Sequence, residues 1–331
     1  MAFWVGKPVL VTGAGGFIGS HVTEALVRAG AAVRAMVHYN SRNDWGQIEW
    51  LDKDIRDALE VVCGDIRDPF FSREAVRGQT VVLHLAALIA IPYSYMAPAD
   101  YVATNVVGTL NILQACRDAG VEKVVHTSTS ETYGTARYVP IDEDHPLQGQ
   151  SPYSASKIGA DKIAESFYLS FETPVATLRP FNTFGPRQSA RAVIPTIISQ
   201  LASGAKQIRL GSLEPVRDFT FVADTARAFL AVAESPRTVG EVVNAGSGKG
   251  VSIGDLVDLV IDVMGCKAVV ECEAARVRPE KSEVLRLVCC ADKIRDLTGW
   301  QPQTSLREGL ALTARYIRAH PELYKPKIYN V

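Results

Sequence analysis

Three glycines at a spacing of three follow directly on a short β-rich segment near the N-terminus. Residues 8–12 (PVLVT) lead into GAGGFIG, residues 13–19, and a helical spacing of apolar residues begins at residue 19. A strand that turns this sharply into a helix opens a doubly wound α/β sheet. The free N–H groups at the start of such a helix bind phosphate. The motif predicts a dinucleotide-binding Rossmann fold, with contacts from Gly13, Gly16, Phe17, Ile18 and Gly19.

Strand-length apolar runs alternate with helical patterns beyond this point, which indicates βαβ units and a parallel sheet. Further strands are predicted at 32–37, 60–63, 80–85, 121–127, 175–178 and 241–244. The pattern is broken at Pro180, Pro186, Pro195, Pro215 and Pro279. We therefore expect an α/β chain with a Rossmann domain at 1–181, segments near 216–262 crossing back to it, and a smaller, irregular α/β substrate domain at 182–331.

Charge and cysteine content narrow the class of protein. Lys and Arg number 35 against 36 Asp and Glu, so no global positive field exists to hold nucleic acid or an anionic membrane. The six cysteines form no C-x-x-C pair, which argues against a zinc or dithiol redox site and fits reduced thiols in a cytoplasmic protein; no metal site is expected. Apolar runs stay well below the roughly 18 residues of a membrane span, and the N-terminus is typical of a strand rather than a signal peptide.

The ends of the next strands carry further candidate cofactor contacts. NAD-binding chains usually close the second strand with an acidic residue, whereas here His38 stands there and Arg42 follows. These side chains could accept a 2′-phosphate, which favours NADP and leaves NAD open. Asp65, beside Ile66, either accepts a hydrogen bond from an adenine amino group or is a turn aspartate. The fourth strand ends in a predicted core histidine, His84, followed by residues that let backbone lie against a cofactor, namely Leu85, Ala86 and Ala87.

Tyr153 and Lys157 stand four residues apart, so on a helix they share one face. An ammonium beside a phenol, together with a nicotinamide cation, lowers the phenol pKa from about 10 toward neutrality. Tyr153 would then act as a general base toward a sugar hydroxyl. The segment TSTSETYG, residues 127–134, leaves a predicted strand just upstream, and Thr129 offers a hydroxyl to hold the substrate oxygen.

Taken in order, these motifs resemble those of extended short-chain dehydrogenase/reductases that modify nucleotide sugars. The glycine motif, Asp65, HLAA at 84–87, residues 127–134, the Tyr153/Lys157 pair, RPFN at 179–182 and RDF at 217–219 cover nearly the whole chain. The pattern is most similar to nucleotide-sugar 4,6-dehydratases. Residues 39–45 and 179–192 resemble the branch acting on nucleotide-linked N-acetylhexosamines, as in legionaminic-acid-type pathways.

The resemblance implies an internal redox cycle with a tightly bound NAD or NADP. Tyr153 takes the proton of the carbon-4 hydroxyl, the cofactor takes the hydride, and Glu131 removes the proton from carbon 5. Water then leaves from carbon 6, which receives the hydride. Related 4-epimerases usually carry a small or uncharged residue at the place of Glu131. Many dehydratases carry Asp where this chain has Ser130, so the acid that protonates the leaving hydroxyl stays open, with Glu131 the simplest candidate.

The resemblance also implies substrate contacts and a homodimer. Pro180 would touch the cofactor, and the expected substrate contacts are Tyr93, Asn182, Arg187, Val193, Arg217 and Arg278. The arginines would clasp the pyrophosphate. Dimerisation would bury the apolar faces of helices at about 99–119 and 154–171, which include Val102, Val106, Leu110, Leu113, Ile158 and Ile163. The alternatives are a nucleotide-sugar 4-epimerase, a UDP-glucuronate decarboxylase and a non-catalytic dinucleotide sensor.

Overall fold

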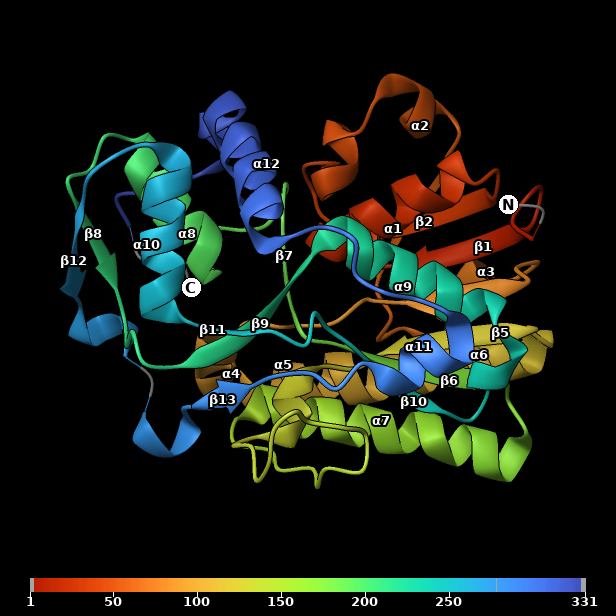
Figure 1. Ribbon diagram of the computed structural model, residues 1–331. Coiled ribbons are helices and arrows are strands. Elements are labelled where there is room, and N and C mark those ends of the chain that lie inside the picture. The colour runs from red at the N-terminus through yellow and green to blue at the C-terminus, as the bar shows by residue number, and fades with distance from the viewer. Residues whose placement is uncertain (1–2, 278, 329–331) are drawn as a thin grey trace.

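A seven-stranded parallel sheet forms the larger of two lobes in the computed structural model, which describes residues 3–277 and 279–328 (Figure 1). The strand order is β10-β6-β5-β4-β1-β2-β3, and every neighbouring pair is parallel. The strands are β1 (Pro8–Thr12), β2 (Ala32–His38), β3 (Glu60–Gly64), β4 (Val81–His84), β5 (Lys123–Thr127), β6 (Val175–Pro180) and β10 (Val242–Ala245). All seven coincide with predicted strands, so the doubly wound parallel sheet is confirmed.

Helices cover both faces of this sheet, and β4 and β6 are accordingly buried along their whole length. One face packs against α1 (Phe17–Arg28), α2 (Lys53–Asp57) and α9 (Val222–Glu234), with α11 (Asp292–Thr298) at its edge. The other face packs against α3 (Pro69–Val76), α6 (Gly108–Ala119) and α7 (Pro152–Phe171). This layering leaves the carboxyl ends of the strands free to carry a site.

The smaller lobe holds two short sheets and three helices around a separate core (Figure 1). In one sheet β9 pairs with β7, β11 and β13, and in the other β8 pairs with β12. The strands are β7 (Asn182–Phe184), β8 (Gln207–Leu210), β9 (Val216–Phe221), β11 (Gly250–Ser252), β12 (Val269–Cys272) and β13 (Arg286–Leu287). The helices are α8 (Val193–Ala202), α10 (Ile253–Met264) and α12 (Leu306–Ala319).

The chain passes between the lobes more than once. After β9 it returns to the larger lobe, where α9 packs beside α1 and β10 adds the outer strand next to β6. It then leaves again for β11 and α10 in the smaller lobe (Figure 1). In sequence, the larger lobe is therefore built from segments that come before and after the first strands of the smaller lobe.

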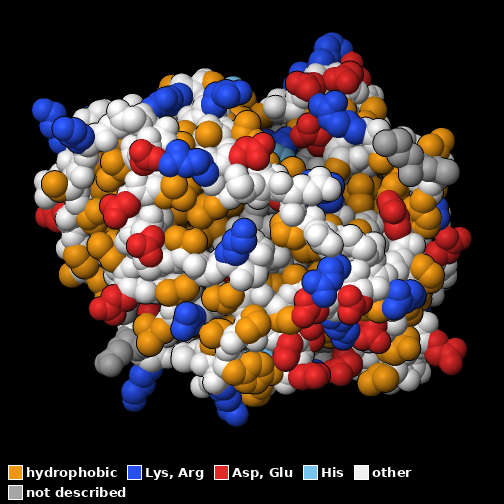
Figure 2. Space-filling view, viewed as in Figure 1, with side chains coloured by type: hydrophobic (Ala, Val, Ile, Leu, Met, Phe, Trp, Pro, Cys, Tyr) orange, Lys and Arg blue, Asp and Glu red, His pale blue; other side chains and the backbone are white. Residues whose placement is uncertain are grey.

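The surface carries no strong bias of charge on the face that Figure 2 shows, where acidic and basic side chains alternate. This agrees with the formal net charge of −1. None of the described helices combines the length and the apolarity needed to cross a membrane.

The helices expected to form a dimer contact occupy one side of the larger lobe. A continuous helical path runs through α5 (Pro98–Tyr101), a π-helical turn η2 (Val102–Val107) and α6, and it packs along α7. Val102 and Leu110 are 52 % and 39 % exposed, as an interface would need. Leu113 is wrong as an interface residue, because its side chain is fully buried against the sheet.

We predict that the protein is a homodimer through these helices. Light scattering at micromolar concentration should give twice the 35.9 kDa mass of the chain. Leu110→Asp should shift the mass to that of the monomer, because a charge in the apolar contact would lack a partner. A wild-type monomer would contradict the prediction.

Candidate active site

The turn between β1 and α1 presses closely against the end of β4. Gly13 has φ +70°, and a Cβ atom there would lie 2.8 Å from the backbone nitrogen of Ala86. A Cβ atom on Gly19 would collide with the carbonyl oxygen of Gly13. Gly16 stands at the N-cap of α1 without a side-chain cap, so the first N–H groups of the helix lack a side-chain partner. The turn forms a backbone cradle whose exposed donors suit phosphate.

His84 is a buried core histidine whose bonds fix the end of β4. Thr12 Oγ1 accepts the N–H groups of Leu85 and Ala86, both at 3.1 Å, so its own proton goes to His84 Nδ1 at 2.8 Å. His84 Nε2 then donates to Thr109 Oγ1 at 3.0 Å, because that hydroxyl donates to the Asn105 carbonyl. Burial lowers the pKa of His84 well below its usual value, so the ring is neutral. The prediction for His84 is confirmed, and Leu85, Ala86 and Ala87 follow it half-buried.

The structure brings His38 and Asp65 together at the ends of β2 and β3. Asp65 Oδ2 lies 3.5 Å from His38 Nε2 and 2.6 Å from an Arg67 guanidinium nitrogen. Its Oδ1 accepts the backbone N–H of Arg67, as a turn aspartate does. The hydrogen bonds from Arg67 lower the pKa of Asp65 against the opposing effect of burial. Ile66 packs into the core beside α3 and α6, and Arg42, 82 % exposed at its side chain, lies 3.6 Å from Asp44.

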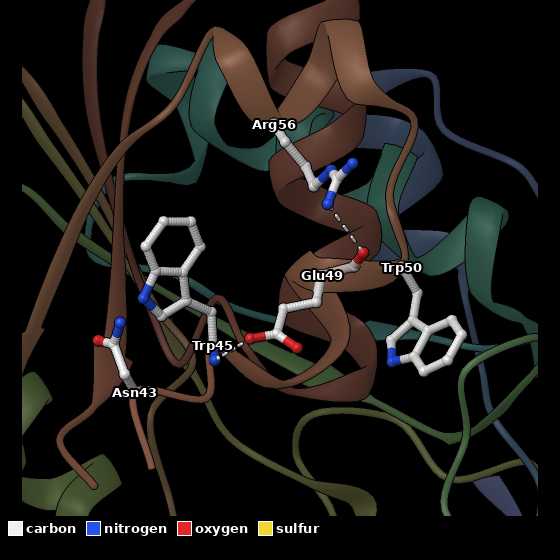
Figure 3. Close-up of a pocket in the computed structure, with 5 residues that line it drawn as sticks. All are labelled: Asn43, Trp45, Glu49, Trp50 and Arg56. Carbon is white, nitrogen blue, oxygen red and sulfur yellow. Dashed lines mark hydrogen bonds between the residues drawn. The ribbon is translucent and has the colours of Figure 1, made fainter. Parts of the chain in front are cut away.

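A pocket of about 490 Å³ lies in the connection after β2 and is lined by Asn43, Trp45, Glu49, Trp50 and Arg56 (Figure 3). The Trp45 backbone N–H donates to the Glu49 carboxylate at 2.9 Å. A Cβ atom on Gly15 would meet the Trp45 carbonyl at 2.6 Å, so this connection is packed against the glycine turn. None of the predicted site residues lines the pocket.

Thr129, Glu131 and Tyr153 meet beyond the end of β5. Thr129 caps the short helix η3 (Ser130–Tyr133), and its Oγ1 accepts the Glu131 N–H at 3.2 Å. Burial raises the pKa of the Tyr153 phenol, a hydrogen bond with Thr129 lowers it, and the nearby Glu131 charge raises it again. Ser130 is buried next to them. The structure thus places a carboxylate and a hydroxyl beside the phenol, as the sequence predicts.

Lys157 lies one helical turn after Tyr153 on α7, whose start is fixed by a capping box between Ser151 and Ser154. Its Nζ donates to the Thr127 carbonyl at the end of β5 at 2.6 Å. Burial lowers the pKa of Lys157 to about 8, although the charge of Asp161 opposes this effect. α7 is therefore tied to the end of β5, two residues before Thr129.

The predicted substrate residues lie in several places. The Asn182 Oδ1 atom is buried without a hydrogen-bond partner at the start of β7, and Pro180 ends β6. Tyr93 lies on α4 (Ile91–Met96), and its ring centre is 6.2 Å from that of Tyr101, which lies 6.1 Å from the ring of Tyr153. A row of rings therefore leads from the surface to the phenol. Val193 is the first residue of α8.

Two of the three predicted arginines, Arg187 and Arg217, are engaged with carboxylates in this structure. Arg187 contacts Glu24 on α1 at 2.7 Å and also His21. Arg217 on β9 lies 3.2 Å from Glu283. Arg278 lies outside the described residues. A pyrophosphate contact from Arg187 or Arg217 would compete with these ion pairs, and it stays a prediction.

A buried polar cluster behind Lys157 was missed by the sequence analysis. It consists of His126 and Ser128 near the end of β5, Asp161 on α7 and Arg179 on β6, all at most 4 % exposed. Arg179 also donates to the Tyr133 hydroxyl at 3.0 Å, and Tyr133 donates to Asn244 on β10 at 2.8 Å. The spacing of Asp161, four residues after Lys157, was the available signal. Within the described part of the chain, no group of His, Cys, Asp and Glu could hold a metal ion.

Comparison with known proteins gives matches over nearly the whole chain. A family model described as GDP-mannose 4,6 dehydratase matches residues 10–313. A dTDP-glucose 4,6-dehydratase of Streptomyces griseus is 31 % identical over 328 residues, which cover 97 % of each chain. Among solved structures, a double mutant of the dTDP-glucose 4,6-dehydratase DesIV from Streptomyces venezuelae, with NAD and DAU bound, has a TM-score of 0.85 at 31 % identity, covering 96 % of this chain and 99 % of that one. A UDP-N-acetylglucosamine 4-epimerase from Methanobrevibacter ruminantium, in complex with UDP-N-acetylmuramic acid, has a TM-score of 0.85 at 29 % identity, with coverage of 96 % and 99 %.

Proposed function

Since the chain belongs to the GDP-mannose 4,6 dehydratase family, we propose that it is a nucleotide-sugar 4,6-dehydratase that forms a 4-keto-6-deoxy sugar. The resemblance to extended short-chain dehydrogenase/reductases of the nucleotide-sugar group is confirmed at the level of the family, and the chain is an enzyme of this group. The observation that carries the choice of reaction is the position of Glu131. Its carboxylate lies close enough to Tyr153 to raise the pKa of the phenol.

The cradle between Gly13 and Ala86 supports binding of a dinucleotide cofactor. A Cβ atom would fill it, and the uncapped start of α1 offers donors to the pyrophosphate. We infer that the glycine turn, the end of β4 and the Tyr153/Lys157 pair hold NAD or NADP. When bound, the nicotinamide accepts a hydride from carbon 4 of the sugar and returns it at carbon 6.

The side chains perform the proton transfers in the proposed reaction. Thr129 holds the carbon-4 hydroxyl next to Tyr153, which takes its proton as general base. The Lys157 ammonium stabilises the Tyr153 phenolate that accepts this proton. Once carbon 4 is a ketone, the hydrogen on carbon 5 is acidic, and Glu131 removes it. Protonated Glu131 then donates to the departing carbon-6 hydroxyl, since Ser130 supplies no carboxylic acid. Carbon 5 takes up one proton when the hydride returns to carbon 6, and Tyr153 releases the one it took from the carbon-4 hydroxyl, so that only water is lost.

We propose a preference for NADP over NAD, supported by His38 and Arg42 near the end of β2. Arg42→Ala should weaken binding of NADP far more than binding of NAD, because only NADP carries a 2′-phosphate. Loss of one charge-assisted contact typically costs roughly 1.5–3 kcal/mol. Fluorescence titration with both reduced cofactors measures this difference. Equal effects on both would contradict the preference.

We further propose a nucleotide-linked N-acetylhexosamine as the substrate. Residues 182–331 would hold it, with Asn182 at the sugar–phosphate linkage, where its Oδ1 atom is free to accept a hydrogen bond. The larger lobe, residues 1–181 with the returning α9 and β10, would hold the dinucleotide. The six cysteines are free thiols, which supports a cytoplasmic location.

Mass spectrometry of single reactions with candidate nucleotide sugars tests the proposed reaction. A dehydratase yields a product lighter by one water. Carbon-4 epimerisation without loss of mass would favour the 4-epimerase instead, a reaction named in the relative from Methanobrevibacter ruminantium. Release of carbon dioxide from UDP-glucuronate would favour the decarboxylase. A tightly bound cofactor without any turnover would favour a dinucleotide sensor.

A further inference from the structure

Asp161 continues the helix face that carries Tyr153 and Lys157. The three residues stand at intervals of four on α7, and side chains at this spacing lie above one another. Tyr153 and Lys157 point toward the proposed reaction site, whereas Asp161 is 4 % exposed and points into the interior beneath β5 and β6. Its side chain bonds to His126, Ser128 and Arg179, and its charge acts on both Lys157 and Tyr153.

Three side chains hold the Asp161 carboxylate: His126 on β5, Ser128 directly after β5, and Arg179 on β6. Ser128 Oγ donates to Oδ2 at 2.6 Å, and Arg179 Nη2 donates to the same oxygen at 2.9 Å. His126 Nε2 lies 3.0 Å from Oδ1. Since an ionised carboxylate only accepts, His126 must donate through Nε2. Its buried Nδ1 has no partner, which fits an unprotonated nitrogen.

The cluster and its surroundings hold one buried anion, Asp161, and two buried cations, Arg179 and Lys157. Burial alone would raise the pKa of Asp161, but the hydrogen bond with His126 and the charges of Arg179 and Lys157 bring it down to about 2. Asp161 is therefore ionised at neutral pH. Burial keeps His126 neutral by lowering its pKa. Asp161 balances Arg179 directly and Lys157 from one helical turn away.

We propose that Asp161 is a positioning residue that, through its bonds to β5 and β6, fixes the reactive face of α7 and keeps the Lys157 ammonium charged beside Tyr153. This role rests on the proposed redox function of Tyr153 and Lys157, which a dehydratase and a 4-epimerase would share. Without the anion, the effect of burial on the Lys157 ammonium would be unopposed, and it would release its proton more readily.

The other titratable groups whose charges act on Lys157, Asp161, Arg179 or Tyr153 lie on several elements around α7. They are His84 on β4, His126 on β5, Arg179 on β6, Glu131 and Tyr133 on η3, Tyr101 on α5 and Tyr153 on α7 itself. The two histidines are neutral, and burial raises the pKa of Tyr101 and Tyr133 to about 12. Asp161 is thus the carboxylate with direct bonds to this cluster.

The Asp161→Asn variant tests the proposal, because it removes the charge and keeps the shape. We expect the alkaline limb of its kcat–pH profile to move to lower pH by about one unit, as for a lost neighbouring charge. The same limb should move in the pH dependence of NADH or NADPH affinity, measured by fluorescence without any sugar. That second readout separates failure of this proposal from failure of the dehydratase assignment.

Asp224→Asn is the matched control. Asp224 is equally buried, accepts the backbone N–H groups of Gln303 and Thr304, and lies on α9, on the opposite face of the sheet from α7. The Asp224→Asn variant should have a lower melting temperature, but the alkaline limbs of its kcat–pH profile and of its cofactor-affinity profile should stay where they are in the wild type. If Asp161→Asn does not fold, Arg179→Gln tests the same coupling. Without Arg179, the Asp161 carboxylate would stabilise the Lys157 ammonium more strongly. The alkaline limb of the kcat–pH profile should then move to higher pH, the opposite of the shift expected for Asp161→Asn. Unmoved limbs in a folded Asp161→Asn or Arg179→Gln protein would overturn the proposal.

Discussion

Reduced nicotinamide should accumulate when the Glu131→Gln variant is mixed with its nucleotide-sugar substrate. Glutamine keeps the size of the side chain, and the backbone N–H of residue 131 still donates to Thr129. The variant cannot take the proton from carbon 5, so the reaction stops after the first oxidation. Loss of a general base typically lowers the rate by roughly two to four orders of magnitude. Absorbance in the near ultraviolet follows the reduced cofactor, and mass spectrometry follows the loss of water.

Two results would contradict the role of Glu131. One is a Glu131→Gln enzyme that releases 4-keto-6-deoxy sugar at close to the wild-type rate. The other is a wild-type enzyme that only interconverts carbon-4 epimers, which would remove the need for a base at carbon 5. Ser130→Ala serves as a neighbouring control on the same short helix, and we expect it to retain elimination because its hydroxyl is no acid for this step.

The Tyr153→Phe variant should show neither reduced cofactor nor product. Phenylalanine fills the same buried space beside Tyr101 but lacks the hydroxyl that bonds to Thr129 and takes the first proton. The expected loss in rate is again roughly two to four orders of magnitude. Here the blocked step is removal of the carbon-4 hydroxyl proton, so the cofactor is not reduced. Stopped-flow absorbance after addition of substrate distinguishes the two variants. A burst of reduced cofactor from Tyr153→Phe would show that another group takes the carbon-4 hydroxyl proton.

The strands of the large sheet were predictable because their signal is local. Each is a short apolar run flanked by helical spacing, and burial on both faces of a parallel sheet favours such runs. The glycine turn was predictable for a similar reason, since Gly13 and Gly19 stand where any Cβ atom would collide with backbone. Tyr153 and Lys157 were found by their spacing together with the segment 127–134 upstream.

The features that could not be predicted have a different physical origin, because they depend on which segments, far apart in the sequence, come together in the fold. Leu113 belongs to a helix with apolar residues on more than one side, and the sequence does not say which side faces the sheet. The surroundings of Arg187 were equally hidden, because the fold brings Glu24 to 2.7 Å from it across 163 residues of chain, and its contact with pyrophosphate stays a prediction. The bonds of Asp161 to Ser128 and Arg179 likewise join residues from separate strands.

The late return of β10 to the large sheet has a consequence for how the protein is made. β6 is complete at Pro180, but its outer neighbour β10 begins only at Val242. A ribosome adds roughly 5–20 residues per second, so a nascent chain carries β6 as an open sheet edge for several seconds. Open edges pair readily with other chains. Newly synthesised protein therefore passes through an aggregation-prone interval, which a chaperone that shields strand edges would cover.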